Sequence, residues 1–384
     1  MNIQKHKILI VIPSLEIGGA ERLLVYLLKY LDRNQFELAL CLFKNKGELL
    51  SDIPPDVKTY FCLKKSRWSF FKLIFGINKV VKDFQPDLIY ARMWYSTLVT
   101  ILAKKIFKWT IPLAANEEHN HKRDIERFDI FGRLKKISMS WAYRQAEAVL
   151  VPSQGVRDEI VPAYRLDPNK TSVIYNAVDL NLIEESLNSS LVTEIPFADD
   201  QPIIAAFGRL IKRKGFDDLL QAFKIVRAKQ PCHLIFIGDG EERQNLEHLA
   251  DELQIKNDVK FMGFMKNPYS LLSRCRLFVL SSLWEGFGNV IIESMACGVP
   301  VVAVKCPYGP SEIITDCENG LLVPTGDISA LANTMIKVLN DNTLQKHIGE
   351  AGKKRSKDFS VEIMVSKYES LLSCISTESF RGGL

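Results

Sequence analysis

The stretch Ser281–Pro300, SSLWEGFGNVIIESMACGVP, decides the fold because a strand end, a glycine-rich turn and a helix start follow one another in it. The apolar run at residues 277–281 predicts a buried strand. Gly286 and Gly288 mark the turn, and a helix is expected from Asn289 to Cys297. The first amides of a helix lack partners within it, so a ligand at this turn can use them.

The same alternation of strand and helix continues on both sides of this stretch. We expect strands at residues 202–207, 232–237, 299–304 and 320–323, and helices at 216–229, 241–254 and 327–339. Strands that alternate with helices in this way favour a parallel sheet covered by helices on both faces.

The N-terminal half contains a second alternating series. Residues 7–12, KILIVI, form a continuous apolar run, which is typical of a strand covered on both faces. A helix is expected at 21–31, and further strands at 36–42, 88–91, 112–115 and 148–151. The polar stretch 184–201 has the composition of a linker. The chain is therefore predicted to be α/β, with two doubly wound halves that face a cleft.

Two acidic and two basic side chains are the candidates for chemistry in the second half. Glu285 lies in the turn and Glu293 one turn into the helix, and both are expected to point toward the cleft. Arg209 and Lys214, in FGRLIKRKG after the first strand of this half, should reach the same place. Fixed cations stabilise a departing diphosphate, and losing one such group typically costs ~3–4 kcal/mol. Lys212 and Arg213, which lie between them, could instead be solvated surface residues without a role in the site.

Two other glycine pairs follow strands. Gly18 and Gly19 form a tight strand-to-helix loop that can approach phosphates or an acceptor. Gly238 and Gly240 start a dinucleotide-like pattern, but Arg243 occupies the position of its third glycine. This departure counts against an NAD-dependent dehydrogenase.

Taken together, the motifs resemble the retaining glycosyltransferases of family four, which have the GT-B fold. The matching pieces are GGAER at 18–22, FGRL at 207–210, GDG at 238–240, EGFGNVIIE at 285–293, GVPVVA at 298–303, GPSEII at 309–314 and NGLLVP at 319–324. The Glu-x7-Glu spacing is the most specific of them.

The resemblance implies two Rossmann-like domains and a role for each motif. The acceptor-binding domain would comprise residues 1–185 and a last helix that returns to it, about 358–384; the donor domain would comprise 200–357. Glu285 would contact the donor sugar, Glu293 the ribose, and Arg209 with Lys214 the diphosphate. Further donor-binding positions would be Gly208, Gly286, Phe287, Gly288, Asn289, Asn319, Gly320, Leu321 and Met262, the last in a turn beside the base.

The family often has a histidine at the end of an N-domain strand, facing the reacting sugar. The comparable place here reads AANEEHN, at residues 114–120, and either Glu118 or His119 could fill that role, beside Gly18 and Gly19 on the acceptor side. The spacing of His119 and His121, without a third ligand, does not favour a metal site. We expect no metal, because the sequence contains no Asp-x-Asp and the pair of Arg209 and Lys214 supplies the positive charge. We expect no cofactor either, because the nucleotide sugar is itself a substrate.

Charge and aromatic residues concentrate in one region. Residues 62–145 contain 17 Lys or Arg against 7 Asp or Glu, interleaved with aromatic side chains. This composition suits an anionic membrane surface, with a solvated basic face as the alternative; we expect no nucleic-acid partner. The eight cysteines include no Cys-x-x-Cys pair, and we interpret them as reduced.

The function expected from the resemblance is retaining, metal-independent transfer of a sugar, with UDP as the favoured nucleotide, to a glycan acceptor. The GGAER and GPSEII forms are similar to members that build lipid-linked oligosaccharides or surface polysaccharide in bacteria. A cytoplasmic location, peripheral at the inner face of the membrane, would follow. A nucleotide-sugar epimerase of the same fold and a non-catalytic scaffold partner are the alternatives.

Overall fold

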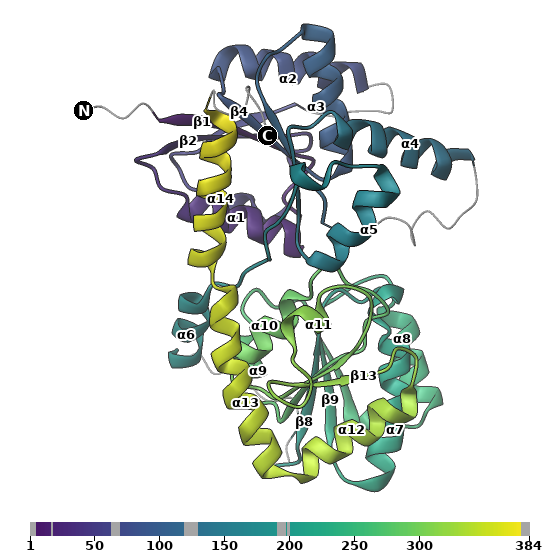
Figure 1. Cartoon of the computed structure of the whole chain (residues 1–384). Helices are drawn as coiled ribbons and strands as arrows, with labels where there is room; N and C mark the ends of the chain where they lie inside the picture. The colour runs from purple at the N-terminus through teal and green to yellow at the C-terminus, as the bar shows by residue number, and fades with distance from the viewer. Residues whose placement is uncertain are drawn as a thin grey trace. The chain divides into compact units, whose positions relative to one another are not determined.

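The structure, a computed structural model, describes residues 5–16, 18–62, 70–118, 130–189, 197 and 200–377. The chain divides into two compact units, Met1–Asn176 with Val361–Leu384 and Ala177–Ser360. Each unit is built on its own parallel sheet (Figure 1). The predicted α/β class with two Rossmann-like halves is confirmed.

The sheet of the first unit has, within the described residues, seven parallel strands in the order β3-β2-β1-β4-β5-β6-β7. Their bounds are β1 His6–Ile12, β2 Phe36–Leu42, β3 Lys58–Phe61, β4 Leu88–Arg92, β5 Leu113–Asn116, β6 Ala148–Val151 and β7 Thr171–Val173. The strand order reverses between β1 and β4. In doubly wound sheets, ligands bind outside the carboxyl ends of the strands at such a point.

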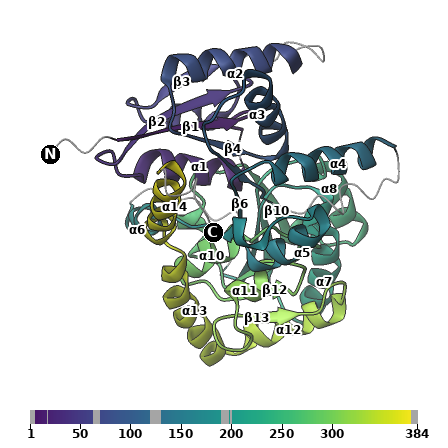
Figure 2. The same ribbon diagram turned by 45° about the horizontal axis from the view of Figure 1, so that its top comes forward.

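Helices cover both faces of this sheet. They are α1 Gly19–Tyr30, α2 Phe70–Phe84, α3 Trp94–Phe107, α4 Ile130–Arg144 and α5 Gln154–Tyr164, with single 3₁₀ turns at Glu48–Asp52 and Pro168–Lys170. Strands β1 and β2 run between α2 and α1 (Figure 2). Residues 8–12 of β1 are consequently almost fully buried, as the continuous apolar run predicted.

The last helix, α14 Val361–Ser376, returns to the first unit and packs against α1 and β4 (Figure 1). Its Tyr368 hydroxyl lies 3.1 Å from the hydroxyl of Tyr90 on β4. The backbone N–H of Asp32 donates to the Glu369 carboxylate at 2.9 Å. The expected return of the C-terminal helix is therefore confirmed.

The second unit repeats the doubly wound arrangement. Its parallel sheet has the order β10-β9-β8-β11-β12-β13 within the described residues. The strands are β8 Ile203–Phe207, β9 His233–Ile237, β10 Val259–Gly263, β11 Leu277–Leu280, β12 Val301–Val304 and β13 Leu321–Val323. The order reverses between β8 and β11, so the loops after these two strands lie side by side at the carboxyl edge.

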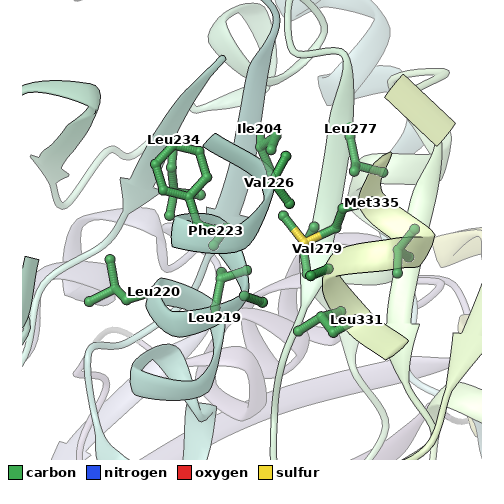
Figure 3. Packing of buried hydrophobic residues seen from close by; sticks show 14 of the residues in the cluster. Ile204, Leu219, Leu220, Phe223, Val226, Leu234, Leu277, Val279, Leu331 and Met335 are labelled. Atoms are coloured by element: carbon green, nitrogen blue, oxygen red, sulfur yellow. The ribbon is translucent and has the colours of Figure 1, made fainter. Parts of the chain in front are cut away.

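Two long helices cover one face of this second sheet. Figure 3 shows Phe223 and Val226 of α7 and Met335 of α12 beside Ile204 and Val279 of the strands. These side chains are almost completely buried. The helices of the unit are α6 Leu180–Asn188, α7 Phe216–Lys229, α8 Arg243–Glu252, α9 Tyr269–Leu272, α10 Asn289–Ala296, α11 Pro310–Ile313, α12 Ile328–Asn340 and α13 Asn342–Ser356, with 3₁₀ turns η4 Lys212–Lys214, Lys256–Asp258 and Lys357–Phe359.

The division between the units lies nearer the N-terminus than the polar stretch 184–201 suggested. Helix α6 precedes most of that stretch, yet it packs against α9 and α10 of the second unit. The Asn267 side-chain amide donates to Ser186 Oγ at 2.5 Å, and the Val178 N–H donates to the carbonyl of Phe359 at 3.0 Å. These contacts place residues 177–188 with the second sheet.

Two general features concern the described part of the chain. None of its helices has both the length and the apolar character needed to cross a bilayer. All eight cysteines are free thiols. Two of them, Cys41 and Cys62 on neighbouring strand ends, approach each other to 3.5 Å between sulfur atoms.

Candidate functional site

A buried ion pair lies at the carboxyl edge of the second sheet. Lys214 ends η4, in the loop after β8, and Glu285 lies in the loop after β11. Because β8 and β11 are neighbours, the two loops meet. Lys214 Nζ is 2.6 Å from Glu285 Oε1, and the two side chains are only 9% and 6% exposed. The structure therefore brings together two of the three predicted catalytic residues.

Two further groups hold the Glu285 carboxylate. Ser282 Oγ donates to Oε1 at 2.6 Å, and Arg213 Nη1 lies 3.4 Å from Oε2. Burial by itself would raise the pKa of Glu285, but attraction by the Lys214 ammonium and the Arg213 guanidinium outweighs it and lowers the pKa. Glu285 is thus a carboxylate at neutral pH, inside a cluster with one surplus positive charge.

Glycines make room for the lysine. Gly208 has φ +148°, and a Cβ there would lie 3.2 Å from Lys214 Cε. Gly215 has φ +58°, and its Cβ would lie 2.3 Å from the carbonyl oxygen of Ser281. Ser281 Oγ in turn donates to the Lys214 carbonyl at 2.9 Å. The predicted donor-site position Gly208 therefore lets the Lys214 side chain cross the end of β8.

Close packing against Phe359 and Gly309 holds the turn between Glu285 and α10 in place. Gly288, at φ +100°, caps the N-terminus of α10, as the predicted helix start at Asn289 requires. Phe287 is buried, and its ring lies 5.5 Å from that of Phe359. A Cβ on Gly309 would lie 1.8 Å from the Phe287 carbonyl oxygen. Phe287 therefore anchors the turn with its side chain, and its backbone packs closely against Gly309.

The second acidic residue is also buried. Glu293 lies on α10, and the Tyr269 hydroxyl donates to its Oε1 at 3.1 Å. The two glutamates of the Glu-x7-Glu motif thus belong to one loop–helix unit, with different partners. Asn319 is buried as well, and its Oδ1 accepts from the Thr315 N–H at 3.0 Å, just before Gly320 and Leu321 lead into β13.

On the donor side, the structure adds one cation to the site and corrects one expectation. Arg209 is exposed just after β8, and its expected contact with the diphosphate stays a prediction. Glu285 is also approached by Arg213, for which the sequence analysis left a solvated role open. The η4 turn aims Arg213 at the β11 loop, where it also donates to the Trp284 carbonyl at 3.3 Å. In a run of consecutive basic residues, spacing alone could not distinguish these cations. Met262 lies in strand β10 beside a bulge, not in a turn, because Gly263 still pairs with β9.

On the acceptor side, Gly18 caps α1 and Gly19 begins it, as the glycine loop predicted. Glu118 forms an ion pair with Arg92, a residue that the sequence analysis did not select. Residues 92 and 118 lie on different strand ends, so no local pattern could connect them. His119 lies outside the described residues.

Comparison with known proteins supports this architecture. The family model described as Glycosyltransferase Family 4 matches residues 17–182, and the model described as Glycosyl transferases group 1 matches residues 191–355. The crystal structure of Anabaena HepE in complex with UDP-glucose has a TM-score of 0.79 at 26% identity, covering 96% of this chain and 99% of that one.

Two curated relatives extend over most of the chain. The N-acetylgalactosamine-N,N'-diacetylbacillosaminyl-diphospho-undecaprenol 4-alpha-N-acetylgalactosaminyltransferase of Campylobacter jejuni is 30% identical over 361 residues, 92% of this chain and 95% of the relative. An uncharacterized glycosyltransferase of Methanocaldococcus jannaschii is 27% identical over 346 residues, covering 79% and 84%. With both halves matched and the GT-B architecture in place, the chain belongs to the group 1 glycosyltransferases of family four.

Proposed function

We propose that the protein is a retaining, metal-independent glycosyltransferase that moves a hexose or N-acetylhexosamine from a UDP-sugar to a lipid-linked glycan acceptor. Such a reaction would serve the synthesis of bacterial surface polysaccharide or oligosaccharide. The observation that carries the proposal is the buried Glu285–Lys214 pair with Arg213 beside it.

The cluster suits a departing nucleoside diphosphate. Its two cations and one carboxylate leave a surplus positive charge, and Arg213 is 30% exposed, so an anion can reach it. When the bond between the sugar and UDP breaks, negative charge grows on the diphosphate, where fixed cations stabilise it. Glu285 can accept hydrogen bonds from sugar hydroxyls because it is held as a carboxylate.

Retention would follow from attack on the same face of the sugar. The bond from the anomeric carbon to the diphosphate oxygen breaks, and its electron pair leaves with UDP. The acceptor oxygen bonds to the anomeric carbon on that face and gives its proton to the departing phosphate oxygen. Lys214 and Arg213 supply charge that a metal ion provides in other enzymes, so we expect EDTA to leave the rate unchanged.

The names of the relatives support the choice of substrates. HepE was crystallised with UDP-glucose, and the C. jejuni relative is named for a diphospho-undecaprenol acceptor. Exposed apolar side chains on α2, α3 and α4 of this chain also suit an acceptor presented at a membrane; they are Phe71, Phe75, Ile106, Leu134 and Ile137. Exposed lysines and arginines lie on the same helices, as an anionic surface requires.

The experiment is a donor screen with UDP-, GDP- and ADP-sugars, with and without an undecaprenyl-diphosphate-linked N-acetylhexosamine. We expect transfer from a UDP-sugar, and an anomeric configuration in the product, read by NMR, equal to that of the donor. An inverted product would refute retention. Conversion of the UDP-sugar without acceptor would identify an epimerase, and no turnover of any donor would favour a scaffold.

A further inference from the structure

An arginine at the carboxyl edge of the first sheet is buried, and two of its donor groups have no acceptor in the part of the chain that the structure describes. Arg92 ends β4 and is 1% exposed. Its Nη2 donates to the Glu118 carboxylate, while its Nε and Nη1 have no hydrogen-bond partner among the described residues. Buried donors without partners lower stability, and a buried ion pair seldom repays its desolvation. The stability of the fold therefore does not account for Arg92.

The place of the pair in the sheet is informative. Arg92 lies on β4, beside β1, where the strand order reverses, and its partner in register on β5 is Asn116. Glu118 follows two residues later, and its side chain is 11% exposed against 1% for Arg92. The carboxylate is thus the accessible end of the pair, at the edge where doubly wound sheets bind ligands. No other described residue is a hydrogen-bond partner of Glu118.

The backbone next to Arg92 is strained, and it is held in place. Met93 has φ 66° and ψ 151°, an unfavourable conformation for a residue with a side chain. The Met93 N–H donates to the Asn116 carbonyl at 3.2 Å, and Thr97 Oγ1 donates to the Met93 carbonyl at 3.0 Å. Ser96 Oγ donates to the carbonyl of Arg92. Backbone strain of this kind concentrates at functional sites. Here the strained residue directly follows Arg92, the last residue of β4, and its contacts hold that end of the strand in place.

A buried aromatic ring also restricts the position of the Arg92 guanidinium. Its Cζ lies 5.7 Å from the centre of the Tyr90 ring, and the Tyr90 hydroxyl is bonded to Tyr368 of the returning helix α14. Strand, turn and C-terminal helix therefore all restrict the direction in which Arg92 can hold its partner.

We propose that Arg92 is a positioning residue that orients the Glu118 carboxylate to accept a hydrogen bond from a hydroxyl of the acceptor sugar. Arg92 is too buried to touch the acceptor and acts through Glu118. A carboxylate held in one direction binds a hydroxyl without the entropic cost of ordering a free side chain. The inference rests on the proposed function, since it names the part of the same protein that receives the acceptor.

The test compares Glu118→Gln, Arg92→Gln, Arg92→Lys and the double variant Arg92→Gln/Glu118→Gln. The control is Lys104→Met, which removes a different ion pair of the same unit. In that pair, Lys104 Nζ lies 2.6 Å from the Glu147 carboxylate, which also accepts a hydrogen bond from the Leu113 N–H at the start of β5. Transfer to an undecaprenyl-diphosphate-linked N-acetylhexosamine is measured with the KM of donor and of acceptor determined separately.

We expect Glu118→Gln and Arg92→Gln to raise the acceptor KM about 10- to 100-fold, the range for a hydrogen bond to a charged group, with the donor KM unchanged. The double variant should be no worse than Glu118→Gln, Arg92→Lys should be intermediate, and Lys104→Met should resemble the wild type. Should Arg92→Gln not fold, Arg92→Lys and Glu118→Gln decide in the same way. An unchanged acceptor KM, or effects that multiply in the double variant, would overturn the role of Arg92. A wild type that transfers from no donor would contradict the proposed function itself.

Discussion

The Glu285 carboxylate contacts Lys214, Arg213 and Ser282, so the arrangement of these side chains depends on its negative charge. Removing one partner from a buried pair leaves the other charge uncompensated, which typically costs ~3–5 kcal/mol. Protonation of Glu285 in acid would have the same effect, because it removes the charge that compensates Lys214 and Arg213.

The stability contributed by Glu285 should depend on pH. Its pKa in the folded protein lies below the ordinary value of 4.5, so this contribution is complete above pH 4.5 and is lost as the pH falls through the lowered pKa. Calorimetric melting of the wild type and Glu285→Gln should give a Tm difference that is constant near neutral pH and shrinks on acidification below 4.5. A difference that widens in acid would show that the carboxylate is not stabilised by its neighbours.

The motif of two glutamates was predictable because both lie in one local stretch, where the strand end, turn and helix start are all visible in the sequence. The doubly wound pattern also predicted that Lys214 reaches the same edge as Glu285. Two other contacts between distant loops were not predictable. Arg213 meets Glu285 only through the pairing of β8 with β11, and Arg92 meets Glu118 only through that of β4 with β5. Spacing along the chain contains no information on these pairings.

The turn from Glu285 to Asn289 depends on the loop that follows β12. Gly309 has φ +67°, and its Cα lies against the backbone of Phe287, whereas Gly326 has φ +77° with nothing within 4 Å of an added Cβ. Both Ala substitutions therefore carry backbone strain, and only Gly309→Ala adds a backbone collision.

We predict that Gly309→Ala lowers kcat by about tenfold or more and destabilises the protein by ~2 kcal/mol beyond Gly326→Ala, through displacement of this turn. Steady-state kinetics and urea unfolding measure the two effects. Equal behaviour of the two variants would mean that the turn does not depend on Gly309.

Helix α14 stabilises the first unit through one pair of buried hydroxyls, Tyr90 with Tyr368. Tyr368→Phe removes one hydroxyl and leaves the other buried without this partner, which should cost ~1–3 kcal/mol. Ser370→Ala is the matched control on the same helix, because Ser370 is exposed and its hydroxyl donates to the Ser366 carbonyl of the same helix. Urea unfolding of both variants tests this; a Tyr368→Phe protein as stable as the control would refute the role of the pair.

Elements with strong patterns were predictable and weakly patterned ones were not. The bounds of β2, β6 and α7 coincide with the predicted ranges because each is a clear apolar or amphipathic run. Strand β3 is partly exposed along its length and α13 is rich in lysine, so neither has a hydrophobic period that reports its conformation. Tertiary contacts determine the conformation of both segments.

The whole molecule should associate with anionic membranes through α2, α3 and α4. Phe71 and Phe75 on α2 are 65% and 61% exposed, and Lys72 and Lys79 are exposed on the same helix. Liposomes with anionic lipid should carry the protein upward in flotation, less so at high salt, because screening weakens the attraction of lysine for the surface.

The double variant Phe71→Ser/Phe75→Ser should reduce this flotation, whereas Leu182→Ser on α6, an exposed apolar side chain of the second unit, should not. No binding of the wild type at low salt would contradict the membrane proposal and leave a soluble acceptor.

The most direct test of the donor site is a comparison of turnover and UDP affinity in Glu285→Gln. Glutamine keeps the size of the side chain but removes the charge that pairs with Lys214. We predict a fall in kcat of about 100-fold or more, as for other groups that act in the transition state, with an undiminished affinity for UDP by calorimetry. Glu247→Gln, which removes an exposed carboxylate paired with Arg243, should leave both unchanged. A Glu285→Gln protein that turns over at the wild-type rate would contradict the assignment of this cluster as the donor site.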